Sequence, residues 1–219
     1  MPKVVVANGL HRTGSTLVYM LAQEIIRQNG QAFTHAGANL REVDALIANH
    51  KARGQGWLTI KSHRWMPMND DPDVVAFYTT RNLADMARSF IGVKVRHGSS
   101  VGEQTAHTIN EIIWQDFFSR YCAPRFPHMH VIKYEDWYGR EAELGAHMAE
   151  RMELPLPDPG AITRDYGVKA IQARADAMTV PAEDESQLRR QHVGPDEGRP
   201  SGSLEGLPPE VVDVLRRHL

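Results

Sequence analysis

Residues 4–17 constrain the fold most, because their pattern predicts a strand, a glycine-containing loop and the start of a helix in direct succession. The β-branched run Val4–Val6 stops at Gly9, and apolar residues with helical spacing follow the loop, namely Leu17, Met20, Leu21 and Ile25. Gly14 comes five positions after Gly9 and is followed by the hydroxyl residues Ser15 and Thr16. The first backbone N–H groups of a helix are unpaired, and the N-terminus of the helix is electropositive. The loop is therefore a candidate site for a phosphate or a similar oxyanion.

The charge of this loop is placed differently from that of the nucleotide triphosphatases. In those proteins a lysine directly follows the second glycine and contacts the β- and γ-phosphates. Here Ser15 has that position, and the cation inside the loop is Arg12. A guanidinium group can bind two oxygens of a phosphate or sulfate at once. The alternative is an ordinary turn between strand and helix, in which the hydroxyl side chains cap the helix.

Composition predicts a single α/β domain over residues 1–219, since 42% of the residues are apolar and can form a sizeable core. A net charge of −2 argues against nucleic acid as a partner, so any basic site has to be local. The single cysteine, Cys122, excludes an internal disulfide and a cysteine-cluster metal site. The apolar start is too short for a signal peptide, and no apolar run is long enough for a transmembrane helix. We therefore expect a soluble, cytoplasmic protein.

Strands and helices alternate along the chain. Apolar and β-branched runs predict strands at the start of the chain and over 31–35, 57–63, 74–81 and 130–134. Helical spacing predicts helices after the first loop, after residue 82, from Pro208, and over 40–52, 104–121, 140–152 and 159–177. This alternation predicts an α/β fold with a doubly wound parallel sheet flanked by helices.

Polar side chains follow several of the predicted strands. In sheets of this type ligands bind beyond the carboxyl ends of the strands. The residues that fall there are Arg12, Lys61, His63, Arg81 and Tyr134. One cation at a strand end can simply be the point where the strand reaches solvent, but several at one edge favour a polyanionic ligand.

Two segments at this edge resemble motifs of the PAPS-dependent sulfotransferases, where PAPS is 3′-phosphoadenosine 5′-phosphosulfate. His11–Thr16 resembles the loop that binds the 5′-phosphosulfate, in which a lysine or arginine precedes Ser/Thr-Gly-Ser/Thr. Lys61–His63 resembles the Lys-Thr-His that closes another strand in the cytosolic branch of the family. The resemblance extends over most of the chain and implies the P-loop-like architecture of the sulfotransferases.

Two further segments resemble the motifs that bind the rest of the nucleotide. Thr80–Phe90 resembles the 3′-phosphate motif, with Arg81 at a strand end and Ser89 eight residues later. Ser89 lies off the apolar stripe of its predicted helix, so it can contact a ligand. Lys133–Trp137 is similar to the Tyr-Glu-Asp-Leu motif, whose tyrosine, here Tyr134, approaches the adenine.

The chain departs from the family pattern at two places. Leu17 replaces the aromatic residue that often follows the first loop and stacks on the adenine. The Arg-Lys-Gly element of the cytosolic branch is absent, although His192–Gly194 together with Gly198 and Arg199 resembles the looser Gly-Lys/Arg loop of bacterial and Golgi members.

The resemblance implies transfer of a sulfuryl group from PAPS to a hydroxyl, with an amine as the second choice, and release of 3′-phosphoadenosine 5′-phosphate (PAP). The acceptor would be a small molecule, a glycan or a lipid, no metal would be needed, and a homodimer is compatible with this function. The residues that the resemblance assigns to the nucleotide are His11, Arg12, Thr13, Gly14, Ser15, Thr16, Arg81, Ser89, Tyr134, Gly198 and Arg199.

By resemblance, His63 takes the proton of the acceptor, while Arg12 and Lys61 neutralise the charge that develops during transfer. Nearby positive charges should lower the pKa of His63 and keep its imidazole neutral near pH 7. Glu42 and His35 are the alternative bases, since members outside the cytosolic branch often use a carboxylate. Helices near 104–121 and 159–178 are expected to wall the acceptor pocket.

Two other classes of protein remain open at this point. A P-loop kinase or NTPase is disfavoured, because the loop lacks its lysine and no convincing apolar strand ends in an aspartate for Mg²⁺. A non-catalytic nucleotide-binding module would keep PAP binding while Lys61 and His63 were dispensable.

Overall fold

The computed structural model describes residues 3–37, 43–54, 56–63, 71–96, 98–122, 129–177 and 199–218. Within these ranges the centre is a five-stranded sheet in the order β2-β3-β1-β4-β5, and each pair of neighbouring strands is parallel. The strands are β1 (Lys3–Asn8), β2 (Phe33–Gly37), β3 (Trp57–Ser62), β4 (Val74–Thr80) and β5 (Met129–Lys133). The predicted doubly wound α/β sheet is therefore confirmed.

Strand β1 is the middle of this sheet, and its sequence explains the position. Val4, Val5 and Val6 are at most 1% exposed, as expected of a β-branched run with both faces covered. Asn8 pairs with Ser62 in β3 and with Tyr78 in β4, so the three strands end nearly level. The chain winds to one side of β1 through β2 and β3 and then to the other side through β4 and β5. The loops after β1 and β4 consequently part at the reversal point, which is where open α/β sheets bind ligands.

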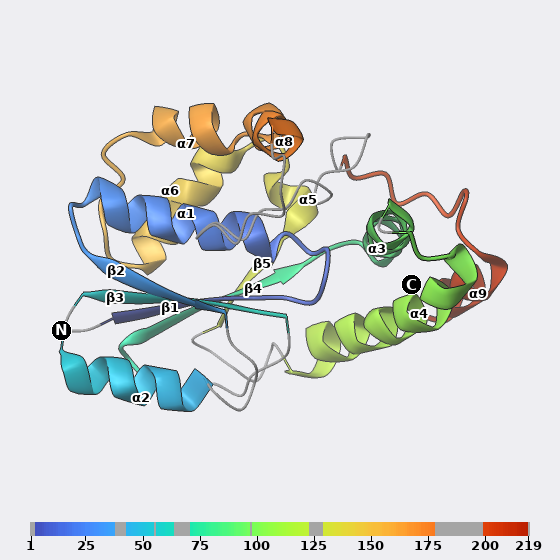
Figure 1. The fold of residues 1–219 in the computed structure, drawn as a ribbon, viewed down its shortest axis with the longest axis horizontal. Helices are drawn as coiled ribbons and strands as arrows, with labels where there is room; N and C mark the ends of the chain where they lie inside the picture. The colour runs from blue at the N-terminus through green and yellow to red at the C-terminus, as the bar shows by residue number, and fades with distance from the viewer. Residues whose placement is uncertain are drawn as a thin grey trace.

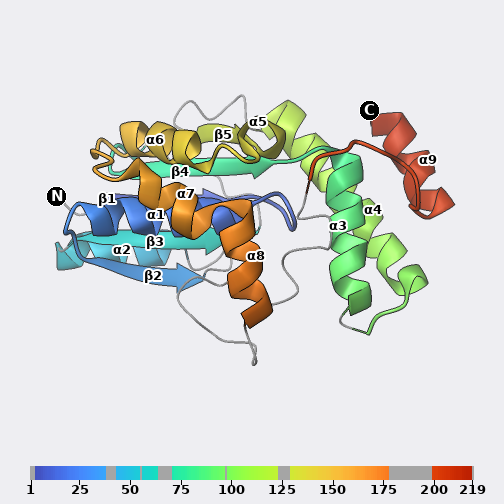
Figure 2. The same cartoon turned by 90° about the horizontal axis from the view of Figure 1, so that it is seen from above.

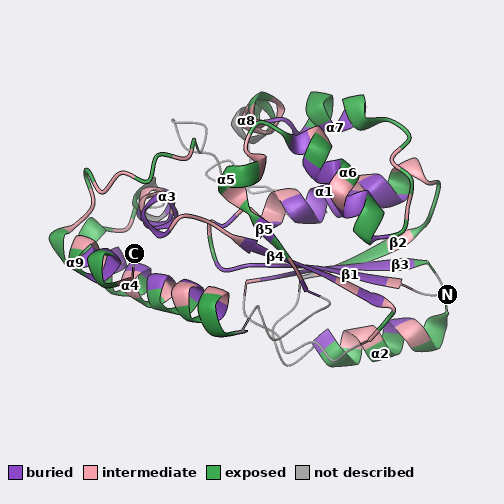
Figure 3. Cartoon of the chain, turned by 180° about the vertical axis from the view of Figure 1, so that it is seen from behind, coloured by how far each residue is buried: buried purple, intermediate pink, exposed green. Residues whose placement is uncertain are grey.

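Helices cover both faces of the sheet (Figure 1). Helices α1 (Ser15–Gln28), α6 (Glu141–Arg151), α7 (Pro159–Tyr166) and α8 (Val168–Ala177) lie on one face, and α2 (Val43–Arg53) lies on the other. The first face holds the larger core, in which Ile25, Ile26, Met148 and Ile162 are fully buried. Figure 3 shows the same distribution, with buried residues in the strands and along the side of α1 that meets the sheet.

A separate helical layer lies beyond the carboxyl ends of the strands (Figure 2). It consists of α3 (Leu83–Arg96), α4 (Val101–Phe117) and α9 (Pro209–His218), which share a core that includes Met86, Ile112 and Leu215. The strand edge and this layer face each other, and the loop after β1 lies between them. The remaining elements are a π-helical turn (Phe118–Cys122) and the short helix α5 (Tyr134–Trp137).

Two helices differ from the predicted ranges. Helix α4 begins earlier than expected, because Ser100 and Glu103 form a capping box in which each side chain accepts a bond from the other's backbone N–H. The predicted helix 159–177 is divided at Gly167, which has extended backbone angles. A Cβ at Gly167 would lie 2.5 Å from the carbonyl oxygen of Thr163, so only glycine fits this bend. No helix in the described ranges is long and apolar enough to cross a membrane.

Candidate active site

The loop between β1 and α1 is held in shape by glycines and threonines. A Cβ at Gly9 would lie 2.0 Å from Thr79 Oγ1, so the loop passes directly against the end of β4. The hydroxyls of Thr13 and Thr79 are 2.7 Å apart, and Thr13 donates to the carbonyl of Leu10 at 2.8 Å. Gly14 precedes α1 with φ 98°, a left-handed conformation that glycine adopts without strain. These contacts hold the loop against the end of β4.

Three of the predicted nucleotide-binding residues meet beside this loop. Arg12 Nε donates to Ser89 Oγ at 3.0 Å, which joins the loop to α3. The guanidinium of Arg81, from the end of β4, lies 3.5 Å from the carbonyl oxygen of Arg12. Arg12 itself has φ 69°, an uncommon value for a residue with a side chain. The structure thus brings Arg12, Arg81 and Ser89 together beside the loop that leads into α1.

The N-terminus of α1 also receives a buried ammonium group. Lys61, the next-to-last residue of β3, is 5% exposed and donates from Nζ to Thr16 Oγ1 at 2.8 Å. Ser15, in the first turn of α1, is 3% exposed. No acidic side chain lies in the first turn of α1, so its charge is not balanced by the helix itself. The arrangement suits an anion held by backbone N–H groups and a lysine.

Tyr134 covers the outer side of the loop. A Cβ at Gly14 would lie 3.0 Å from Cδ2 of the Tyr134 ring, so the ring can pack this closely only against glycine. The guanidinium of Arg81 lies 4.3 Å from the centre of the same ring, a cation–π contact. Burial raises the pKa of Tyr134 to about 12, although Arg81 acts in the opposite direction. The phenol therefore stays protonated at neutral pH and presents an O–H group.

His63 follows β3 and is neutral at physiological pH. Burial lowers its pKa to about 3, and the positive charge of Lys61 contributes in the same direction, with smaller effects of His11 and Arg12. The predicted direction of this shift is confirmed, and burial rather than charge is its largest cause. Nδ1 of His63 lies 3.2 Å from the carbonyl oxygen of Gly9.

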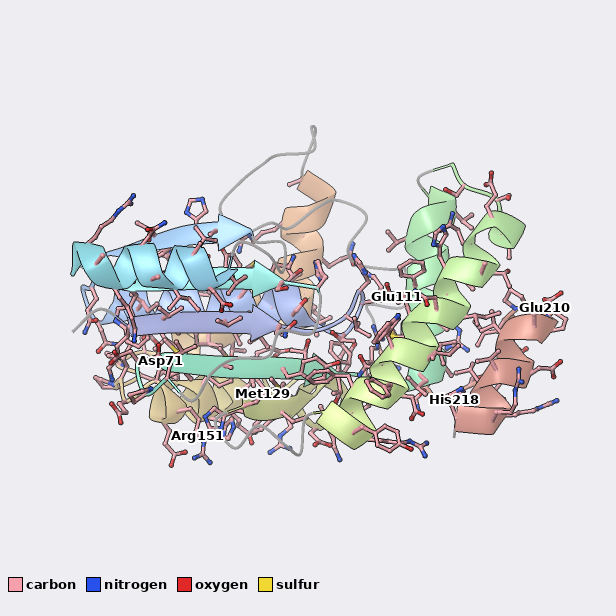
Figure 4. The ribbon with its side chains drawn as sticks, turned by 90° about the horizontal axis from the view of Figure 1, so that it is seen from below. Asp71, Glu111, Met129, Arg151, Glu210 and His218 are labelled. Carbon is pink, nitrogen blue, oxygen red and sulfur yellow. The ribbon has the colours of Figure 1, made fainter. Side chains whose placement is uncertain are left out.

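His11 and Glu111 extend the site toward α4, and the role of Glu111 was not predicted. The rings of His11 and His63 are stacked, with centroids 4.5 Å apart and planes 20° apart. Nδ1 of His11 lies 3.2 Å from Glu111 Oε1, across the gap between the strand edge and the helical layer. Figure 4 shows Glu111 on the side of α4 that faces the sheet. The sequence carried no local signal for this contact, because 100 residues separate the two partners.

The C-terminal segment that begins at residue 199 is anchored to α3 by Asp85 and Arg88. Asp85, which is 3% exposed, accepts hydrogen bonds from the backbone N–H groups of Ser201 and Gly202 and from the Ser201 hydroxyl. Arg88 donates to Ser201 Oγ and to the carbonyls of Ser203 and Glu205. This clamp holds the chain that follows Arg199. Arg199 itself is exposed, and Gly198 lies outside the described residues.

Of the two alternative bases, the structure describes only His35. His35 is an exposed residue inside the edge strand β2, where it pairs with Thr59. Glu42 and the segment His192–Gly194 lie outside the described residues.

Removing the Asp85 carboxylate should loosen the C-terminal segment. Burial alone would raise the pKa of Asp85, but its hydrogen bonds from Gly202 and Ser201 lower it below the usual value. A group with a depressed pKa stabilises the fold above its unfolded pKa of about 4, and this stability is lost as the pH falls through the folded pKa. We expect Asp85→Ala to lower the free energy of unfolding by about 1–3 kcal/mol at pH 7 and by less near pH 3. Urea unfolding at both pH values checks this, with the exposed Asp213→Ala as a control that should change little.

Comparison with known proteins identifies the fold. No family model matches the chain, and no curated protein matches it. Among solved structures, mouse sulfotransferase SULT7A1 complexed with PAP aligns with a TM-score of 0.60 at 11% identity, covering 98% of this chain and 82% of that chain. The sulfotransferase domain of the Synechococcus PCC 7002 olefin synthase aligns at 9% identity with a TM-score of 0.48, covering 99% and 94% of the two chains. The likeness to SULT7A1 confirms the expectation from the sequence: this chain has the P-loop-like α/β fold of the sulfotransferases.

Proposed function

We propose that the protein transfers a sulfuryl group from PAPS to a hydroxyl of a small-molecule, glycan or lipid acceptor and releases PAP. The observation that carries this proposal is the grouping of Arg12, Arg81 and Lys61 around the loop that leads into α1, within a sulfotransferase fold. A nucleotide with anionic groups at both its 5′ and 3′ positions matches this distribution of positive charge.

The nucleotide would be held by two groups of residues. The backbone of residues 13–16, with Arg12 and Lys61, would bind the 5′-phosphosulfate, because the first amide N–H groups of α1 attract an anion and Lys61 lies beside them. Arg81 and Ser89 would bind the 3′-phosphate beside it. Tyr134, already packed on Arg81, would border the adenine. Gly198 and Arg199 are the further residues that the resemblance assigns to the nucleotide.

Transfer requires little covalent chemistry from the protein. The acceptor oxygen forms a bond to sulfur while the bond from sulfur to the bridging oxygen of the 5′-phosphate breaks, and that electron pair stays on the phosphate of PAP. Arg12 and Lys61 would stabilise the charge that builds up on the bridging and equatorial oxygens, as cations do in phosphoryl transfer. The sequence assigns the acceptor proton to His63. The lowered pKa of His63 makes it a weak base for this step.

Screening acceptors with ³⁵S-labelled PAPS tests this proposal. We expect label to move from PAPS to phenols or alcohols with stoichiometric release of PAP. Transfer of phosphate from ATP instead would assign the protein to the P-loop kinases. That class is disfavoured, since none of the strands in the described ranges contains an aspartate to hold Mg²⁺.

A further inference from the structure

His11 and His63 both carry a hydrogen-bond partner that fixes which ring nitrogen bears the proton. The partner of His63 Nδ1 is the carbonyl oxygen of Gly9, which can only accept. The partner of His11 Nδ1 is an oxygen of Glu111, and an ionised carboxylate can only accept as well. When neutral, each ring therefore has its proton on Nδ1, and its Nε2 is the atom able to take a second proton.

The two stacked rings are unequal as proton acceptors. Two imidazolium ions with ring centres 4.5 Å apart would repel each other, so the pair takes up one proton at a time. His63 is the poor site for it, since burial and the charges of Lys61, His11 and Arg12 keep its pKa near 3. The His11 side chain is 48% exposed and has the Glu111 carboxylate at its other nitrogen. A positive charge on His11 is therefore both solvated and balanced.

Glu111 is a mostly buried carboxylate that His11 satisfies only in part. Its side chain is 17% exposed, and its second oxygen, Oε2, is buried with no hydrogen-bond partner among the described residues. A buried oxygen without a partner destabilises the fold, so such atoms often belong to functional sites. The rings of Phe90 and His11 are in edge-to-face contact, and His63 stacks on His11, so two aromatic neighbours pack against the His11 ring.

We propose that His11, oriented by Glu111, accepts the proton of the acceptor hydroxyl. This inference rests on the proposed function. As the acceptor oxygen bonds to sulfur, its O–H bond breaks, the proton moves to Nε2 of His11, and the electron pair of that bond stays on the oxygen. The imidazolium is paired with Glu111 and then returns its proton to solvent. Glu111 is a positioning residue, and His63 supports the His11 ring by stacking.

Kinetics of paired variants separate His11 from His63 as the base. His11→Gln should lower kcat by about 10²–10⁴-fold, a larger effect than any change in the Kd for PAP, to which the resemblance also assigns His11. His63→Asn retains a donor for the Gly9 carbonyl and should lower kcat by less than about tenfold. The probe reaction is PAP release from PAPS with a panel of phenols and primary alcohols. A near-normal kcat in His11→Gln, with a large loss in His63→Asn, would overturn the proposal.

The pH profile distinguishes a positioning role of Glu111 from a merely structural one. Glu111→Gln keeps an acceptor oxygen for His11 but removes the charge that stabilises the imidazolium, so the acid limb of kcat should move to lower pH. If His63 were the base, the acid limb would lie near pH 3 in both proteins and would not move.

NMR of the histidine rings needs no turnover, so it tests the role of His11 separately from the proposed sulfotransferase function. In ¹⁵N-histidine NMR spectra of the protein, with and without PAP, both rings should show the Nδ1–H form, and His63 should stay neutral from pH 9 to pH 5. Uptake of a proton by His63 before His11 would overturn this inference even if PAP binds. If PAP fails to bind, the proposed function fails, and the histidine forms measured in the free protein still decide between the two rings.

Discussion

Replacing Lys61 with methionine should lower kcat for sulfuryl transfer by about 10²–10³-fold, the typical loss when one preorganised charge at a reacting centre is removed. The ammonium group is buried against Thr16 at the N-terminus of α1, where water does not screen it. Methionine retains the length and the apolar stem of the side chain, so the sheet edge stays packed. Initial rates with labelled PAPS measure the effect, and circular dichroism verifies the fold.

Lys51 provides the matched control for this substitution. It forms ion pairs with Asp71 and Asp73, and Lys51→Met should leave kcat within about twofold. Equal rates for Lys61→Met and Lys51→Met would remove Lys61 from the reaction and leave it a structural residue.

Arg81→Ala should weaken PAP binding by roughly 100-fold, equivalent to about 2–3 kcal/mol for the loss of a charge-assisted contact. Adenosine 5′-phosphosulfate lacks the 3′-phosphate, so its affinity should fall much less. Ser89→Ala should change the same preference in the same direction by a smaller amount, because a neutral hydroxyl donates a weaker bond to phosphate than a guanidinium. Calorimetric titration of both nucleotides gives the two ratios.

Arg120→Ala is the control for loss of a guanidinium elsewhere. Arg120 lies in the π-helical turn after α4 and pairs with Asp116 of α4, and its removal should leave both affinities unaltered. Unchanged preference between the two nucleotides in Arg81→Ala and in Ser89→Ala would show that the 3′-phosphate is bound elsewhere.

The parts of the fold and of the candidate site that depend on local sequence patterns could be predicted from the sequence. The run Val4–Val6, the two glycines and the apolar spacing after them predicted the first strand, its loop and the following helix, because strand and helix periodicities are local properties. The cations at strand ends were predicted to meet because parallel strands end at a common edge. The structure brings Arg12, Arg81 and Lys61 together there.

Contacts between distant segments could not be predicted in this way. Glu111 lies in an amphipathic helix, and the sequence of that helix gives no reason to place it opposite His11. Asp85 lies in the first turn of α3, and nothing near it in the sequence indicates its hydrogen bonds with Ser201 and Gly202. His63 contacts the loop after β1 through the Gly9 carbonyl and the His11 ring. The positive charges near His63 could be anticipated from the sequence, whereas the burial that lowers its pKa most could not.

Nucleotide-dependent thermal stability tests the central claim most directly. A ligand that binds only the folded state at about 100 times its Kd adds roughly 2.7 kcal/mol, which for a domain of this size raises Tm by roughly 5–10 °C. We expect such a shift with PAP and a much smaller one with Mg²⁺-ATP at the same concentration. An equal or larger shift with Mg²⁺-ATP, or none with PAP, would contradict the assignment of the Arg12, Arg81 and Lys61 cluster to a 3′-phosphorylated sulfuryl donor.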